Sequence, residues 1–291
     1  MRALIFGISG QDGFYLNALL KQKEIEVIAV SRSSGNWLTG DVAIKQTVEN
    51  LIREYKPDFV FHLAANSTTR HEALFENHET ITTGSLNILE ACYKFSKGTR
   101  IFLSGSAVQF QNKGDPIDEA SSFAPLSPYA VSRIASVYAG RYYRSLGLKV
   151  YVGYFFNHDS PLRTERHVNQ KIISAVKRIA KGSNEIIEIR DIAVKKEFNF
   201  AGDVVEAIWI LMQQENHYEA VIGTGKAYSI EDWIKICFNI VRLDWKKYVT
   251  EKQDFVSEYN TLVSDPKLIM SLGWKQKTSI EQLAQMMYHS N

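Results

Sequence analysis

The first twenty residues of the chain place three glycines between an apolar stretch and an amphipathic one. Residues 2–6 read Arg-Ala-Leu-Ile-Phe, the glycines follow, and residues 14–20 have helical spacing. This order of strand, glycine turn and helix is typical of a dinucleotide-binding fold. Gly7 permits a tight turn, Gly10 lets the backbone approach a pyrophosphate, and Gly13 lets the helix pack closely on the strand. We therefore expect a dinucleotide at the start of this helix rather than a purely structural turn. The other loop residues expected beside it are Ser9, Gln11 and Asp12.

Short apolar strands and helical stretches alternate along the next part of the chain. The predicted strands are residues 26–30, 59–65, 100–103 and 148–156, and the predicted helices are 47–55, 77–95 and 127–146. Such alternation predicts parallel pairing through right-handed crossovers. The expected fold class is α/β, a Rossmann-type doubly wound parallel sheet.

The pattern loosens after about residue 168 and predicts a smaller C-terminal α/β lobe. Its expected elements include strands 186–189 and 218–223 and a helix over 203–213. We expect an NAD(P)-binding domain over residues 1–165 and a substrate lobe over 166–291, with interleaved elements allowed. A ligand held between the two lobes is typical of such a boundary.

The composition excludes several classes of function. The formal net charge is only +2 and basic residues are scattered, so no nucleic-acid partner is expected. Cys92 and Cys237 lie far apart in no metal or redox spacing, which predicts reduced core residues and no metal site. No apolar run reaches membrane-spanning length. These features predict a cytoplasmic protein with a small or anionic ligand.

The ends of the second and third strands refine the cofactor prediction. In the dinucleotide fold an acid after the second strand binds two ribose hydroxyls, but this strand ends in Ser-Arg-Ser-Ser at 31–34. Arg32 between serines suits a 2′-phosphate, which favours NADP over NAD, although it could also be a solvated surface residue. A turn with Asp41 and Val42 could meet the adenine edge. Further residues expected against the cofactor are Leu63, Ala64 and Ala65, whereas His62 is expected to be a core histidine.

A tyrosine and a cation one helical turn apart suggest acid–base chemistry. Tyr129 and Arg133 share one face of the predicted helix over 127–146, and such pairing can let a phenol act as an acid or base near neutral pH. An aromatic and cationic surface face is the alternative. Ser104 and Ser106 follow the strand at 100–103, where ligands of parallel sheets bind. The polar loop after residue 156 contributes Asn157.

Five motifs in sequence order resemble one family. They are Gly7-Ile-Ser-Gly-Gln-Asp-Gly-Phe-Tyr-Leu16, Ser127-Pro-Tyr-Ala-Val-Ser132, Phe155-Phe-Asn-His-Asp-Ser-Pro161, Gly223-Thr-Gly-Lys-Ala-Tyr-Ser229, and Ser264-Asp-Pro with Leu272-Gly-Trp274. Together they resemble the extended short-chain dehydrogenase/reductases, also called the NAD-dependent epimerase/dehydratase family. Within it the chain is most similar to the GDP-mannose 4,6-dehydratases and the GDP-4-keto-6-deoxymannose reductases.

The resemblance implies a Rossmann domain that binds NAD(P) and a C-terminal lobe that binds a nucleotide-sugar. Tyr129 takes the place of the base that moves a proton at the sugar C4 hydroxyl. Arg133 stands where the family has a lysine that holds the nicotinamide ribose, and its planar fork differs from the point charge of lysine. Lys196 stands where an arginine is usual and could meet a phosphate, and Lys171 could face either a diphosphate or water.

Two departures from the family concern the reaction and the nucleotide. The dehydratases carry a hydroxyl residue after the fourth strand and, two positions on, a glutamate that helps to expel water. Matching the motifs places Gly105 and Ala107 there, so the usual carboxylic acid is missing. Where relatives carry an arginine for the nucleotide diphosphate, this chain has Val256.

Three functions remain open from the sequence. We put first an NADP-dependent oxidoreductase acting at C4 of a nucleotide-linked hexose, reducing a 4-keto-6-deoxy intermediate. The alternatives are a GDP-mannose-type 4,6-dehydratase and a cofactor-binding but catalytically weakened partner protein. By analogy with the family, we expect a homodimer formed through helices 77–95 and 127–146.

Overall fold

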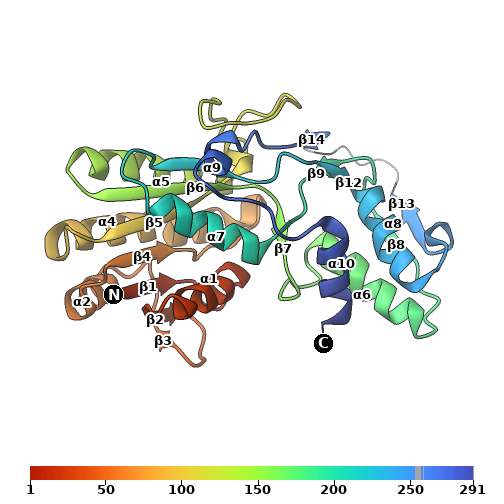
Figure 1. Cartoon of the computed structure of the whole chain (residues 1–291), viewed down its shortest axis with the longest axis horizontal. Helices are drawn as coiled ribbons and strands as arrows, with labels where there is room; N and C mark the ends of the chain where they lie inside the picture. The colour runs from red at the N-terminus through yellow and green to blue at the C-terminus, as the bar shows by residue number, and fades with distance from the viewer. Residues whose placement is uncertain (253–256, 258, 291) are drawn as a thin grey trace.

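A parallel sheet of seven strands forms the larger part of the molecule (Figure 1). The computed structural model describes residues 1–252, 257 and 259–290. The strand order is β11-β6-β5-β4-β1-β2-β3. The strands in this order are Glu219–Ile222, Lys149–Phe155, Arg100–Ser106, Phe59–His62, Arg2–Phe6, Glu26–Ser31 and Leu38–Thr39. This arrangement confirms the predicted α/β fold with a doubly wound parallel sheet.

Both faces of the sheet are covered by helices, which is why its central strands are apolar throughout. On β1, Leu4 and Phe6 pack toward one helical layer, whereas Ala3 and Ile5 pack toward the other. The first layer holds α2 (Lys45–Tyr55), α4 (Gly84–Phe95) and α5 (Pro128–Ser145). The second holds α1 (Gln11–Gln22), α7 (Ala201–Met212) and α9 (Lys267–Ser271).

The helix predicted over 77–95 consists of two helices joined by a wider turn. Here α3 (Leu74–Asn77) continues into a π-helical segment, η2 (His78–Thr83), and then into α4. The π-helical segment turns the Thr80 carbonyl toward the His62 ring, 3.1 Å from Nε2, and the Thr82 hydroxyl toward α5. Wider turns of this kind occur frequently at functional sites.

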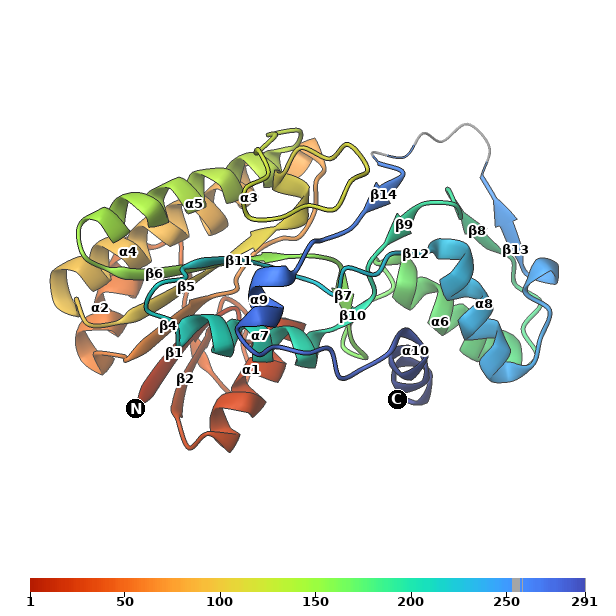
Figure 2. The same cartoon turned by 45° about the horizontal axis from the view of Figure 1, so that its top comes forward.

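A smaller lobe packs beside the sheet and has its own core (Figure 2). Its helices are α6 (Val168–Ala180), α8 (Ile230–Val241) and α10 (Ile280–His289), which enclose Trp233 and Phe238. Its strands are β8 (Ile187–Ile189) with β13 (Val249–Glu251), and β9 (Lys195–Lys196) with β12 (Tyr228–Ser229) and β14 (Thr261–Leu262). Between lobe and sheet lies the pair β7 (His158–Asp159) and β10 (Asn199–Phe200).

The chain crosses between the two parts more than once. After α6, β8 and β9, it returns to the sheet to form α7 and β11, and it then re-enters the lobe at β12. The division at residue 165 therefore stays a proposal, with α7 and β11 counted among the interleaved elements. No helix among the described residues is long and apolar enough to cross a membrane.

A fully buried carboxylate joins three distant segments where sheet and lobe meet. The side chain of Glu197, between β9 and β10, accepts hydrogen bonds from Thr224 N at 2.5 Å and from Ser264 N at 2.7 Å. Ser264 Oγ and Asn199 Nδ2 also donate to it, at 2.6 Å and 3.1 Å. A Cβ at Gly223 would lie 2.5 Å from this carboxylate, so the position needs glycine. The Gly-Thr-Gly and Ser-Asp-Pro motifs thus meet at one buried charge.

We expect Glu197→Ala to lower the free energy of unfolding by about 3 kcal/mol, because several buried donors lose their acceptor. Urea unfolding followed by circular dichroism measures the change. Glu72→Ala is the matched control, since Glu72 is exposed and should change stability by no more than about 0.5 kcal/mol. Equal stability of the two variants would contradict the assigned role of Glu197.

Candidate functional site

The carboxyl ends of the central strands open into two cavities of about 290 Å³ and 200 Å³. The larger cavity extends from the glycine turn past β5 and the start of α5 to the loop after β6. The smaller one lies over the end of β2. Four residues line both cavities: Gly7, Gly10, Leu63 and Ala65. One elongated ligand can therefore pass over the glycine turn from one cavity into the other.

The glycine turn is packed too closely for side chains at two of its three positions. A Cβ on Gly7, whose φ is +97°, would lie 2.5 Å from Ala64 N, and one on Gly13 would lie 2.4 Å from Gly7 O. At Gly10 the nearest atom to such a Cβ is 3.5 Å away. Gly10 therefore has room on its outer side, next to the free N–H groups at the start of α1.

The smaller cavity contains the polar residues predicted around a 2′-phosphate. Ser9 Oγ lies 2.9 Å from Ser31 Oγ, and Val42 and Ala64 supply apolar walls. Arg32 lines the same cavity, with its Nη2 3.0 Å from Oε1 of Glu76. Because this ion pair is solvent-exposed, Arg32 can exchange it for another anion at little cost.

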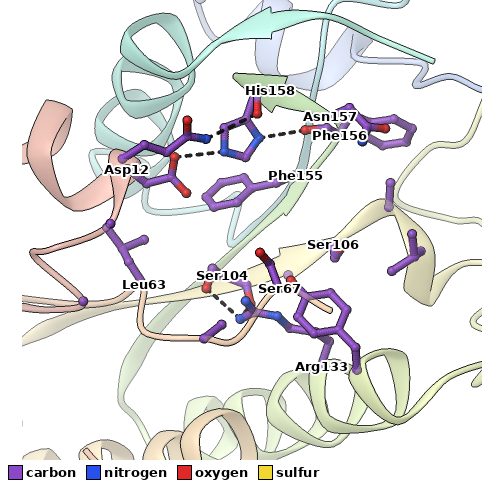
Figure 3. A pocket seen from close by; sticks show the side chains of 18 of the residues that line it. Asp12, Leu63, Ser67, Ser104, Ser106, Arg133, Phe155, Phe156, Asn157 and His158 are labelled. Atoms are coloured by element: carbon purple, nitrogen blue, oxygen red, sulfur yellow. Dashed lines mark hydrogen bonds and ion pairs between the residues drawn. The ribbon is translucent and has the colours of Figure 1, made fainter. Parts of the chain in front are cut away.

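Tyr129 and Arg133 of α5 close one side of the larger cavity. Figure 3 shows the Arg133 side chain extending from α5 toward Ser104. Ser127 caps α5 by accepting a hydrogen bond from Ala130 N at 3.2 Å, and Pro128 occupies the first helical turn. Arg133 Cζ lies 5.0 Å from the Tyr129 ring centroid. Arg133 is buried, and no carboxylate among the described residues pairs with it.

The guanidinium of Arg133 is held by the end of β5. Its Nη1 donates to the Ser104 carbonyl and to Ser104 Oγ, the latter at 2.7 Å, whereas its Nε has no partner among the described residues. Burial, and next the Arg133 charge, lower the pKa of His62 to about 3, so this core histidine is neutral. The cavity wall thus carries the Arg133 cation, which no described carboxylate neutralises and whose Nε–H is available to a ligand.

Strand alternation distinguishes the hydroxyl groups at the end of β5. Ser104 Oγ donates to the His62 carbonyl at 2.9 Å, so its proton is used. Ser106 Oγ accepts from the backbone of Gln109 and keeps its proton free to donate. A Cβ on Gly105 would point the other way, 2.7 Å from the Tyr154 ring. The motif match set Gly105 against the family's hydroxyl residue, but a side chain at position 105 would face Tyr154. Of the two predicted serines, Ser106 is the one with a proton to donate.

The opposite wall of the larger cavity comes from the loop after β6. Asn157 and His158 line it, and His158 Nε2 lies 2.9 Å from Asp12 Oδ1 of the glycine loop (Figure 3). Gln11 Nε2 donates to the His158 carbonyl at 3.3 Å, and Gln11 Oε1 accepts from Ser160 Oγ at 2.9 Å. These hydrogen bonds connect the glycine loop directly to the loop after β6.

Three predicted site residues do not line either cavity. Asp41 accepts a hydrogen bond from Ala43 N within its own turn, and Lys171 donates to the Glu188 carbonyl at 2.8 Å. Lys196 is buried in β9, with Nζ 5.3 Å from the Phe198 ring centroid. Val256 lies outside the described residues.

Sequence reasoning missed several residues that line the larger cavity: Ser67, Thr69, Arg163, His167 and Leu262. Arg163 belongs to the polar loop that was predicted, and its position four residues after Asp159, with which it pairs at 3.2 Å, was the available signal. Leu262 reaches the cavity because β14 pairs with β9, and no pattern in the sequence around residue 262 predicts that pairing.

Comparison with known proteins gives matches along nearly the whole chain. Residues 4–287 match the family described as GDP-mannose 4,6 dehydratase. GDP-mannose 4,6 dehydratase 1 of Arabidopsis thaliana is 33% identical, over 98% of this chain and 88% of that protein. UDP-glucose 4-epimerase of Thermotoga maritima, solved with UDP-glucose, has a TM-score of 0.89 at 22% identity, covering 100% of this chain and 98% of that one. RMD from Pseudomonas aeruginosa, complexed with NADPH, has a TM-score of 0.84 at 22% identity, covering 99% and 96%.

We expect Gly13→Ala to lower the free energy of unfolding by roughly 2 kcal/mol, because the new Cβ meets backbone atoms of the turn. Gly98→Ala is the control, since a Cβ there meets no atom within 4 Å. Thermal unfolding of both variants measures the effect. If Gly13→Ala is as stable as Gly98→Ala, the turn is less tightly packed than described.

Proposed function

The chain belongs to the GDP-mannose 4,6-dehydratase family, and on that premise we propose that it is an NADP-dependent enzyme that dehydrates GDP-mannose, with hydride transfer at the sugar C4. The observation that carries this proposal is the continuous cavity from the glycine turn to Tyr129 and Ser106. The family match over residues 4–287 supports dehydration over the 4-keto reduction that the sequence analysis put first.

The residues of both cavities fit a dinucleotide phosphate. The open side of Gly10 and the start of α1 would hold the pyrophosphate, and Ser9 with Arg32 would hold the 2′-phosphate. The unpartnered Nε of Arg133 would donate to the nicotinamide ribose. The similar fold of RMD, which was solved with NADPH, supports this assignment. When bound, the nicotinamide supplies the hydride acceptor for the sugar.

Tyr129 and Ser106 would act together at the sugar C4 oxygen. No described residue holds the Tyr129 oxygen by a hydrogen bond, so this oxygen is open to a ligand and, as the phenolate, would take the proton of the C4 hydroxyl. The free O–H of Ser106 would donate to the same oxygen and keep it oriented. The C4 ketone acidifies the C5–H bond, so the C5 proton and the C6 hydroxyl would leave together as one water. Return of the hydride to C6, with a proton to C5, would then give the 4-keto-6-deoxy sugar, so that the net change is the loss of one water.

The elimination of water lacks its usual acid at the end of β5. Two positions beyond Ser106 is Val108, and Ala107 is also apolar. Asp12 is the one carboxylate among the described residues that line the larger cavity, and it is paired with His158. A positioned acid typically contributes about a hundredfold to ten-thousandfold. This observation favours a second candidate, reduction of a GDP-4-keto-6-deoxy sugar, which needs no such acid.

Two incubations of the purified protein distinguish these candidates. GDP-mannose with NADP should yield a nucleotide-sugar lighter by one water, detected by mass spectrometry. Oxidation of NADPH by GDP-4-keto-6-deoxymannose, without the first reaction, would instead establish the reductase. If neither reaction occurs while the cofactor binds tightly, the chain is a cofactor-binding partner protein and the proposed enzyme function is wrong.

We expect Tyr129→Phe to reduce turnover by at least about a hundredfold with less than a twofold change in cofactor affinity, because only the phenolic proton acceptor is lost. Turnover is measured by product mass and affinity by NADPH fluorescence. Tyr138→Phe on the exposed side of α5 is the control and should retain full activity. Undiminished turnover of Tyr129→Phe would exclude this tyrosine as the base.

We expect Arg32→Ala to weaken NADP binding by about tenfold or more while leaving NAD binding nearly unchanged, since only NADP carries the 2′-phosphate. Glu76→Gln should bind NADP slightly more tightly than the wild type, because it releases Arg32 from its ion pair. Titration calorimetry with both dinucleotides measures these changes. Equal losses for NADP and NAD in Arg32→Ala would contradict the 2′-phosphate assignment.

For assembly and location we propose what the sequence predicts. A homodimer through α4 and α5 is supported by exposed apolar side chains on these helices, namely Leu86, Val131, Tyr138 and Tyr142. The cytoplasmic location likewise stays a prediction.

A further inference from the structure

Both ring nitrogens of His158 face hydrogen-bond acceptors. Nδ1 lies 2.9 Å from the Phe156 carbonyl, and Nε2 lies 2.9 Å from Asp12 Oδ1. A carbonyl and a carboxylate accept but do not donate, whereas a neutral imidazole carries only one N–H. Both contacts are favourable only when both nitrogens are protonated. The geometry therefore requires an imidazolium paired with a carboxylate.

The pair sits where the glycine loop meets the loop after β6. Asp12 belongs to the first turn of α1, and His158 opens β7. His158 is 8% exposed, and its ring packs edge-on against Phe155, with ring centroids 5.4 Å apart. Both charged residues line the larger cavity (Figure 3), as does Gly10.

An unpaired Asp12 would oppose the proposed function of the loop. The start of α1 attracts phosphates through its free N–H groups, and a carboxylate there repels them. We propose that His158 is a positioning residue held as an imidazolium, which neutralises Asp12 and so lets the glycine loop accept the pyrophosphate of the dinucleotide. This inference rests on the proposed dinucleotide binding, but the charge state of His158 can be tested without it.

The charged and titratable groups around His158 leave Asp12 as its only direct ionic partner among the described residues. The groups on the elements packed against it are Asp159 beside it, Arg163 and His167 before α6, and Lys196 and Glu197 before β10. Asp159 pairs with Arg163 and accepts from Asn169 Nδ2 at 2.5 Å. Arg163 also donates to the His158 carbonyl at 3.0 Å.

These surroundings set the direction in which pH acts on the pair. Burial lowers the pKa of His158, but the charge and hydrogen bond of Asp12 outweigh it and raise the pKa above 6.5. Burial raises the pKa of Asp12, but the charge and the hydrogen bond of His158 oppose it, and the resulting pKa lies below its usual value. The folded-state pKa of His158 is raised and that of Asp12 is lowered, so the ion pair is present near pH 6.5. It is lost as pH rises through the pKa of His158, and also in strong acid, where Asp12 takes up a proton. Dinucleotide binding should weaken as pH rises through the pKa of His158.

Nitrogen-15 NMR of the cofactor-free protein tests the charge state directly. The chain has 7 histidines, and the spectrum of His158→Gln identifies the signal of residue 158. At pH 7 we expect both ring nitrogens to show imidazolium shifts in the wild type, and a single neutral tautomer in Asp12→Asn. A neutral His158 in the wild type at pH 7 would overturn the inference. If His158→Gln does not fold, comparison with Asp12→Asn still identifies the signal.

The pH dependence of NADPH affinity tests the consequence for the glycine loop. We expect the Kd of the wild type to rise roughly tenfold between pH 7 and pH 9.5, a range above the 2′-phosphate ionisation near pH 6. Asp12→Asn should change by less than about twofold, because it has no charge left to neutralise. His158→Gln should bind at pH 7 as weakly as the wild type does at pH 9.5.

The outcomes separate this inference from the proposed function. Parallel pH curves for the wild type and Asp12→Asn would overturn the inference while leaving dinucleotide binding intact. Absence of NADPH binding in the wild type at every pH would contradict the proposed function and the inference together.

Discussion

The structure depends on a close approach between the glycine turn and the end of β4. The backbone around Gly7 and Gly13 lies so near its neighbours that a single methyl group at either position would overlap backbone atoms. This contact seats α1 directly on the carboxyl end of β1. It also leaves Gly10 exposed between the two cavities, so the same packing that forms the core defines the path of the ligand.

The sequence predicts the parts of this fold that local patterns encode. Central strands buried on both faces are apolar throughout, which made the parallel sheet predictable from its alternation with helices. The return of β11 to the edge of that sheet, and the approach of Leu262 to the larger cavity, depend on pairings between distant strands. No local pattern carries such pairings, so these features became visible only in the structure.

Prediction of the site succeeded or failed for similar reasons. Gly10 and Arg133 lie in motifs with fixed spacing, and the structure brings both to the cavity wall. The motif match set Gly105 against the family's hydroxyl residue, although a side chain there would face Tyr154, because a shift of one position reverses the direction of a side chain on a strand. The contact between Asp12 and His158 joins two motifs that were each noticed but could not be paired from the sequence. The residues around the glycine turn were therefore predicted more accurately than those at the end of β5.

The buried carboxylate of Glu197 bears on the order in which the chain assembles. Its partner Ser264 lies 67 positions downstream, and Thr224 lies 27 positions downstream. Contacts that close such long loops form late in folding, because the loop entropy must be overcome before any bond is gained. During synthesis, the donors of this carboxylate are complete only after residue 264 has been added. The contact between sheet and lobe at Glu197 is thus completed late in folding. The segment around Ser264 therefore stabilises the arrangement of both parts of the molecule.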